Sequence, residues 1–219
     1  DGQFELLYQP LIGLGDRRPV GVEALIRWRH PDLGTISPID FIPIAEATGI
    51  IDEIGLWVLE EACRQVRQWQ QDLPGQGQLY ASVNLSPLQL QSPTLVEDVF
   101  AALARTGLAA GHLTLEITES AVVNEDAATR TLATLRSHGI RIAIDDFGTG
   151  YSSLRYLTSL PIDIVKIDRS LTSGLDGTPE HAIIIDSVLR LGHTLHFTLV
   201  VEGVETAAQA DELQALGCQ

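Results

Sequence analysis

The chain has 219 residues, of which 45% are hydrophobic and 20% are charged. It is long enough to bury one sizeable core and too short for two ordinary catalytic domains, so we expect a single domain over residues 1–219. The formal net charge of −15 argues against DNA as a ligand, because an acidic surface repels a polyanion. No apolar run has the length of a bilayer crossing and the first residues lack the pattern of a secretion signal, which predicts a cytoplasmic domain.

The two cysteines lie far apart in the sequence. Cys63 and Cys218 also lack the spacing that is typical of a zinc site. We therefore expect reduced, buried thiols, with neither a disulfide nor bound zinc.

The first elements in chain order are two apolar runs. Residues 4–14 (FELLYQPLIGL) and 19–28 (PVGVEALIRW) are joined by the turn-like sequence GDRR, which predicts an antiparallel β-hairpin. From residue 51 to 71 the apolar positions recur every three or four residues, at Ile54, Val58, Ala62, Val66 and Trp69. This period predicts an amphipathic helix with one buried face.

Short apolar runs then alternate with helix-like stretches. The expected strands cover residues 79–86, 113–120, 140–148, 163–168 and 197–205, and the expected helices include 125–139 and 180–194. Strands that are apolar on both faces and separated by helices indicate a parallel sheet covered by helices. With this many units, we expect an α/β fold of the (β/α)₈ TIM-like barrel type, ahead of an open doubly wound sheet.

The end of the chain departs from a complete barrel. Seven strands can be counted, and residues 206–217 read as a helix that ends at Gly217. A parallel barrel that stops there has an unpaired edge. We therefore expect that the closing strand is missing, so that the domain is incomplete at its C-terminus.

Nearly every expected strand ends in a polar residue that can supply oxygen to a metal ion. These residues are Glu23, Asn84, Glu116, Asp145, Asp146 and Glu202, and Lys166 lies in a further strand. In a parallel barrel the carboxyl ends of the strands converge on one rim, where active sites are built. Oxygen ligands select hard cations such as Mg²⁺ or Mn²⁺, and adjacent aspartates suit a pair of ions. Two ions about 3.5–4 Å apart can promote phosphodiester hydrolysis.

Each of these residues also has a simpler interpretation. A single glutamate at a strand end is usually a solvated loop residue, and Lys166 could form a structural ion pair with Asp168. Asn84 could cap the turn into SPLQLQ, where Ser86 before Pro87 is an equally good helix start. The repetition of carboxylates favours a shared site, with Lys166 facing it and holding the nucleophilic water or a phosphate oxygen.

At these residues the sequence strongly resembles the EAL domain family of cyclic di-GMP phosphodiesterases. The tripeptide that names the family is Glu23, Ala24 and Leu25, within EALIRWRHP. The resemblance continues through FIPIAEATG, NLSP, LEITES, DDFGTGYSSL, KIDRS and VVEGVET, in the family's order and across almost the whole chain. It implies a barrel whose first strand is antiparallel to the others, and hydrolysis of cyclic di-GMP to the linear dinucleotide pGpG.

The resemblance implies two sets of metal ligands. Those of the first metal are Glu23, Asn84, Glu116 and Asp145, and those of the second are Asp145 and Asp146. The metals would be Mg²⁺ or Mn²⁺. Glu202 resembles the next acidic residue of the site, which binds the second metal directly or through water and could share proton handling with Lys166.

The resemblance also implies contacts outside the metal site. Arg27 and Leu25 match positions that bind the substrate, and a guanidinium can grip two phosphate oxygens at once. Residues 146–154 resemble a mobile loop beside the metals, and Glu119 and Glu205 resemble the residues that anchor it. Family members often dimerise through this loop and often carry sensor or GGDEF domains upstream, so we expect a homodimer and such a domain in the full-length protein.

Two other functions stay open. A degenerate EAL domain would sense cyclic di-GMP without cleaving it, and a metal-dependent barrel enzyme could act on a carbonyl substrate with Lys166 as the reactive amine. The presence of every matched metal ligand favours hydrolysis over sensing. The paired aspartates and Arg27 suit a phosphodiester better than a carbonyl compound.

Overall fold

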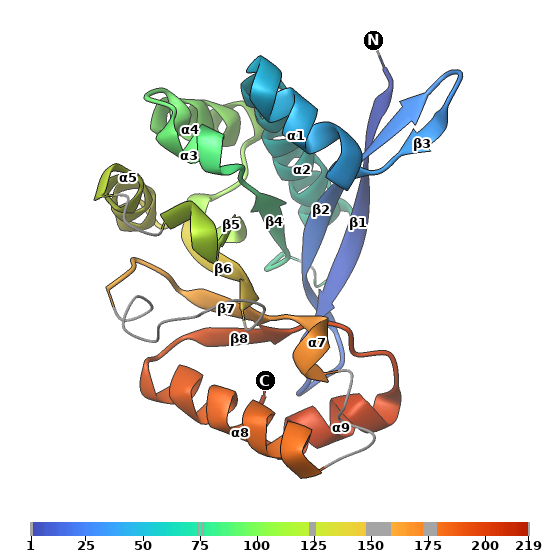
Figure 1. The fold of residues 1–219 in the computed structure, drawn as a ribbon, viewed down its shortest axis with the longest axis vertical. Helices are drawn as coiled ribbons and strands as arrows, with labels where there is room; N and C mark the ends of the chain where they lie inside the picture. The colour runs from blue at the N-terminus through green and yellow to red at the C-terminus, as the bar shows by residue number, and fades with distance from the viewer. Residues whose placement is uncertain are drawn as a thin grey trace.

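A computed structural model describes residues 2–73, 75, 77–122, 126–147, 159–172 and 179–218. Its centre is one curved mixed sheet with the strand order β1-β2-β4-β5-β6-β7-β8, and a short strand β3 that pairs with β2 (Figure 1). The described residues place β1 and β8 at the two ends of this order. The sheet is therefore curled like part of a TIM-like barrel, which confirms the expected fold class.

The antiparallel part of the sheet is the predicted hairpin. β1 (Phe4–Ile12) pairs with β2 (Pro19–His30), with Gln9 opposite Glu23. The sequence did not predict β3 (Gly34–Ile36), which folds back on the end of β2. Gly34 makes this turn with a φ of 73°, a left-handed conformation that glycine adopts without strain.

The other strands run parallel to β2. They are β4 (Tyr80–Asn84), β5 (Leu113–Thr118), β6 (Arg141–Phe147), β7 (Ile164–Ile167) and β8 (Thr198–Val201). All five were predicted, each with slightly wider bounds. Since β8 ends at Val201, Glu202 follows directly at its carboxyl end.

Helices connect the strands and cover the sheet (Figure 1). The α-helices are α1 (Pro38–Thr48), α2 (Ile51–Asp72), α3 (Pro87–Gln91), α4 (Leu95–Thr106), α5 (Asp126–Ser137), α7 (Arg169–Thr172), α8 (Pro179–Thr194) and α9 (Ala207–Ala215). Two 3₁₀ turns, Ala110–His112 and Glu119–Val122, flank β5. No helix of the described residues is long and apolar enough to cross a membrane.

The core lies between the sheet and these helices. On α2 the predicted stripe is buried at Ile54, Val58, Ala62 and Val66, while Trp69 is only partly buried. Strand side chains such as Leu113 and Ile142 are fully buried, and burying one such side chain contributes about 1.5–3 kcal/mol. Both cysteines are buried and form no disulfide, as expected. The apolar core therefore covers the outer face of the curled sheet, beneath the helices.

Candidate active site

Strand register brings the predicted site residues to one face of the sheet. Side chains two residues apart on a strand point the same way. Glu23 lies opposite Ser82, Asn84 opposite Glu116, and Thr118 opposite Asp145. Some neighbouring site residues are therefore offset by two positions along their strands: Asn84 lies two residues beyond the partner of Glu23, and Asp145 lies opposite the residue two beyond Glu116. Such an offset is the stagger that a barrel requires. The site residues all stay on the inner face near the carboxyl ends of the strands.

Lys166 lies at the centre of this group. Its Nζ is 2.7 Å from Glu116 Oε2, 2.8 Å from Glu202 Oε1, 3.1 Å from Asp145 Oδ1 and 3.2 Å from Glu23 Oε2. Lys166 and Glu116 are each only 1% exposed, and Glu23 is 9% exposed. One ammonium therefore contacts carboxylates from four other segments of the chain in a place that is almost closed to solvent.

Burial and mutual repulsion shape the acidity of the cluster. Burial disfavours the ammonium of Lys166, but Glu116, Asp145 and Glu23 outweigh it and raise the pKa of Lys166. Burial also raises the pKa of Glu116 to about 7, against the opposing attraction of Lys166. Burial also raises the pKa of Glu202. The cluster holds more negative charge than a single ammonium can neutralise.

Two further hydrogen bonds orient the carboxylates. Asn84 Nδ2 donates to Glu23 Oε1 at 2.9 Å, and the Ser82 hydroxyl donates to Glu116 Oε1. Sequence reasoning did not identify Ser82, although it lies two residues before Asn84 and therefore on the same face of β4. A serine two residues before Asn84, within an expected strand, was the signal that could have found it. Its 1% exposure leaves it no access to bulk water.

Two buried carboxylates and one half-buried carboxylate have the geometry of a cation site. Glu23, Glu116 and Asp145 each offer an oxygen, and these oxygens all lie within 4.8 Å of one another. The donors are oxygen atoms only, a set that suits hard divalent cations. A cation would relieve the repulsion that raises the pKa of Glu116. The residues therefore fit a divalent metal.

A β-bulge places the second aspartate. The pairing of β6 with β7 shifts register between Ile144 and Phe147, so Asp145 and Asp146 together take the place of one regular residue. Asp146 has a φ of 56°, and its N–H donates to Asp145 Oδ1 at 3.0 Å. Burial, followed by the charge of Asp145, raises the pKa of Asp146. The bulge therefore lets two successive carboxylates lie at the same rim.

The residues predicted to contact substrate lie farther along β2. Leu25 and Arg27 follow Glu23 at intervals of two, so both are on its face of the strand, and both are half-buried. The Arg27 guanidinium donates to the backbone carbonyl of Ile26 at 2.8 Å. This placement brings Arg27 to the rim beyond the carboxylates, and its contact with substrate stays a prediction.

The predicted loop anchors are only partly tested by the structure. Glu119 is half-buried in the 3₁₀ turn directly after β5, and Glu205 is exposed between β8 and α9. Of the predicted loop, residues 148–154 lie outside the described residues. The anchoring roles of Glu119 and Glu205 therefore stay predictions.

Two of the simpler interpretations are wrong. Ser86, not Asn84, caps α3, because its hydroxyl accepts the N–H of Leu88. Asp168 accepts a hydrogen bond from the N–H of Ser170, while Lys166 pairs with the carboxylate cluster instead. Asn84 and Lys166, which could have had local structural roles, therefore both belong to the rim.

The fold and the rim together define a barrel-like α/β protein with a buried acidic site that can hold a cation. A family model described as "EAL domain" matches residues 1–219, and the chain belongs to the EAL domain family. The resemblance noted from the sequence motifs is thereby confirmed.

Curated relatives are longer proteins. The bifunctional diguanylate cyclase/cyclic di-GMP phosphodiesterase MucR of Pseudomonas aeruginosa is 46% identical over 217 residues, which cover 99% of this chain and 31% of MucR. The cyclic di-GMP phosphodiesterase NbdA of the same organism is 42% identical over 220 residues, which cover 100% of this chain and 28% of NbdA. This chain therefore spans less than a third of the length of these relatives.

Solved structures share the fold closely. The PaMucR phosphodiesterase in complex with cyclic di-GMP has a TM-score of 0.90 at 46% identity, covering 99% of this chain and 87% of that one. The EAL enzyme Bd1971 with cAMP and cyclic di-GMP bound has a TM-score of 0.93 at 33% identity, covering 100% of this chain and 60% of that one. Both likenesses extend over essentially all of this chain.

Proposed function

We propose that this chain hydrolyses cyclic di-GMP to the linear dinucleotide pGpG in a metal-dependent reaction. The observation that carries the proposal is the convergence of Glu23, Glu116 and Asp145, from three strands, around buried Lys166. The names of MucR and NbdA, and the cyclic di-GMP in the PaMucR structure, support the choice of substrate. Hydrolysis of a phosphodiester is also chemistry that an oxygen-only cation site can promote.

We assign the metal ligands from the same geometry. Glu23, Glu116 and Asp145, with the amide oxygen of Asn84, would hold one Mg²⁺ or Mn²⁺, and Asp145 with Asp146 would hold a second. Bound divalent cations supply Lewis-acid polarisation of the phosphate and a water of lowered pKa. Ser82 keeps the Glu116 carboxylate oriented toward the site, because its hydroxyl holds one of the two oxygens.

The chain's own polar groups handle substrate and protons. Lys166 stays charged, since its pKa is raised by the surrounding carboxylates, and can donate hydrogen bonds to the attacking water or to a phosphate oxygen. Glu202, half-buried with a raised pKa, can hold a proton at the edge of the cluster. Arg27, at the outer part of the same face, would bind a phosphate through paired N–H groups.

Incubation of the chain with cyclic di-GMP and Mg²⁺ or Mn²⁺ tests the proposal, with pGpG separated and quantified by chromatography. We expect pGpG to accumulate only when a divalent cation is present, and to be lost in Glu23→Ala. Glu97→Ala is a matched control, because Glu97 is an exposed glutamate on α4. Tight binding of cyclic di-GMP without product in the unaltered chain would identify a sensor domain instead.

The setting of the reaction is part of the proposal. The matching regions of MucR and NbdA are parts of longer proteins. We therefore propose that this domain acts beside an upstream sensor or GGDEF domain. We place it in the cytoplasm, where a second messenger is made and degraded. We also propose that it forms a homodimer. Light scattering of the purified chain would test this, and retained activity in a strictly monomeric sample would show that pairing is not needed.

A further inference from the structure

The end of the barrel opposite the carboxylates carries unpaired basic and polar groups. Among the described residues, four buried side-chain atoms lack a hydrogen-bond partner, and three of them are His112 Nδ1, Thr114 Oγ1 and Arg141 Nε. Thr114 and Arg141 are direct partners in the register of β5 and β6, and His112 comes two residues before Thr114. Buried polar groups normally have partners, so three such atoms in one layer point to a shared ligand.

Arg141 is the centre of this layer. Its guanidinium lies over the ring of Tyr80, with Cζ 3.9 Å from the ring centroid, and burial lowers the pKa of Arg141. The ring of Tyr80 in turn occupies the space beside Gly21, where a Cβ atom would lie 2.5 Å from the Tyr80 ring. The residues that the structure describes give Arg141 no ion pair. Among the described residues this half-buried cation therefore has no direct ion pair, and Asp163 acts on it only at longer range.

Other basic groups strengthen the local field. Burial, then Arg141 and Arg67, lower the pKa of His112, so the three groups are close enough to interact. A cluster of basic groups is unusual in this chain, which has 29 Asp and Glu residues and 14 Lys and Arg residues. A positive spot in an acidic protein attracts small anions locally.

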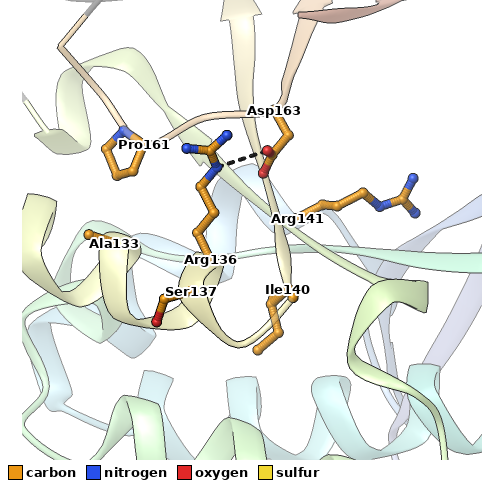
Figure 2. A pocket seen from close by; sticks show the side chains of 8 residues that line it. Ala133, Arg136, Ser137, Ile140, Arg141, Pro161 and Asp163 are labelled. Atoms are coloured by element: carbon orange, nitrogen blue, oxygen red, sulfur yellow. Dashed lines mark hydrogen bonds and ion pairs between the residues drawn. The ribbon is translucent and has the colours of Figure 1, made fainter.

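A cavity borders this layer, and Arg141 is one of its lining residues. This cavity of about 440 Å³ lies between α5 and the segment before β7, and Figure 2 shows Arg136 reaching Asp163 across it. In the same view Arg141 extends away from Arg136, on the other side of β6. Asp163 pairs with Arg136 at 2.9 Å, so Arg141 is the arginine of this lining without an ion pair among the described residues.

We propose that the amino-terminal end of the barrel binds a small oxyanion, a carboxylate or phosphate group, between Arg141, His112 and Thr114. Arg141 supplies the charge and Nε–H, and the Thr114 hydroxyl supplies a donor from inside the layer. His112 Nε2 lies beside Gln78 Oε1, so His112 would donate its free Nδ1–H to the anion in the protonated form, which the anion's charge favours. The ligand would satisfy all three atoms at once. This site is separate from the proposed catalytic rim, since it lies at the opposite ends of the same strands, and it does not depend on hydrolysis.

Titration of the ¹⁵N-labelled chain with phosphate, and separately with acetate, tests the site at constant ionic strength. Metal is removed beforehand with EDTA and the EDTA is dialysed away, so that no metal at the carboxylate rim can bind phosphate and no chelator carboxylate competes for the site. We expect saturable shifts of the amide signals of His112, Thr114 and Arg141. The two titrations distinguish a phosphate from a carboxylate ligand. Absence of saturable shifts with both anions would overturn the proposal.

Substitutions complete the test. Arg141→Gln should weaken the anion's affinity roughly tenfold or more, as loss of a charged hydrogen bond does, whereas Arg130→Gln removes an exposed arginine of α5 and should change nothing. If Arg141→Gln does not fold, Thr114→Val keeps the side-chain shape, removes the hydroxyl and should weaken binding roughly fivefold. If the folded variant, Arg141→Gln or else Thr114→Val, binds the anion as tightly as the unaltered chain does, the site is ruled out.

Discussion

Lys166 Nζ lies 2.7 Å from Glu116 Oε2, and both side chains are almost completely buried. A buried ion pair is weak evidence for stability, yet removing one partner is costly because the other charge stays buried without compensation. This pair therefore connects the stability of the domain to the charge state of its site.

The first prediction concerns Lys166→Met. Without metal, we expect this variant to lose about 3–5 kcal/mol of unfolding free energy, because the carboxylates lose their only close cation among the described residues. With saturating Mg²⁺ the loss should be smaller, since the metal compensates the same charge. Urea unfolding with EDTA and with Mg²⁺ measures the difference. An equal loss under both conditions would contradict a shared site.

The same variant separates stability from catalysis. Under conditions where Lys166→Met is folded and metal-loaded, we expect cyclic di-GMP hydrolysis to fall by roughly 10²–10⁴-fold, the typical contribution of a positioned proton-handling or charge-stabilising group. The turnover rate at saturating substrate is the measurement. A normal rate would show that Lys166 has a purely structural role.

The second prediction concerns Ser82, which donates to the oxygen of Glu116 that does not face Lys166. Ser82→Ala should weaken Mg²⁺ affinity about 10- to 100-fold, as loss of groups that orient metal ligands does. Calorimetric titration with Mg²⁺ measures this. Ser137→Ala is a suitable control, because the exposed Ser137 hydroxyl donates to the backbone carbonyl of Thr134 and lies beside His138 Nδ1, and neither partner belongs to the carboxylate cluster. Equal affinities in the two variants would deny Ser82 its orienting role.

The third prediction is a pH dependence of the metal-free protein. The pKa of Glu116 is about 7 in the fold, against an ordinary value of 4.5, because burial disfavours its anion. The folded state therefore binds the proton more tightly than the unfolded state does. This contribution to stability is fully present below about pH 4.5 and is lost as the pH rises through 7.

Urea unfolding in EDTA at pH 5, 6, 7 and 8 would measure this dependence, with Glu116→Gln as the matched variant that cannot titrate. We expect the unaltered chain to lose stability relative to Glu116→Gln as the pH rises. Mg²⁺ should bind more tightly over the same range, since binding displaces the proton. A stability difference that does not change with pH would contradict the raised pKa.

Much of the fold was predictable because local patterns agree with the tertiary structure. The alternation of apolar strands and helices located every parallel strand, and the period of residues 51–71 located α2. The polar strand ends located Glu23, Asn84, Glu116 and Asp145, since parallel strands bring their carboxyl ends together.

What was missed depends on pairing between distant segments. β3 has only three residues, too few for a periodic pattern, and exists because it pairs with the end of β2. The bulge at Asp145 and Asp146 arises from the register between β6 and β7. Ser82 has meaning only through Glu116 on the neighbouring strand. Such features need the partner strand to be placed first.

The last prediction follows from that bulge. Asp146 adopts a φ of 56°, a conformation that asparagine and glycine tolerate better than alanine. Asp146→Asn should keep the stability of the parent while losing most hydrolysis, because the backbone is satisfied but the second carboxylate is gone. Asp146→Ala should lose the same activity and also about 1 kcal/mol of unfolding free energy relative to Asp146→Gly, because only alanine carries a strained Cβ. Urea unfolding and pGpG formation, measured on all three variants, separate the two effects. If alanine and glycine gave equal stability, the left-handed backbone at this position would be wrong, whereas full activity in Asp146→Asn would remove this residue from the proposed metal ligands.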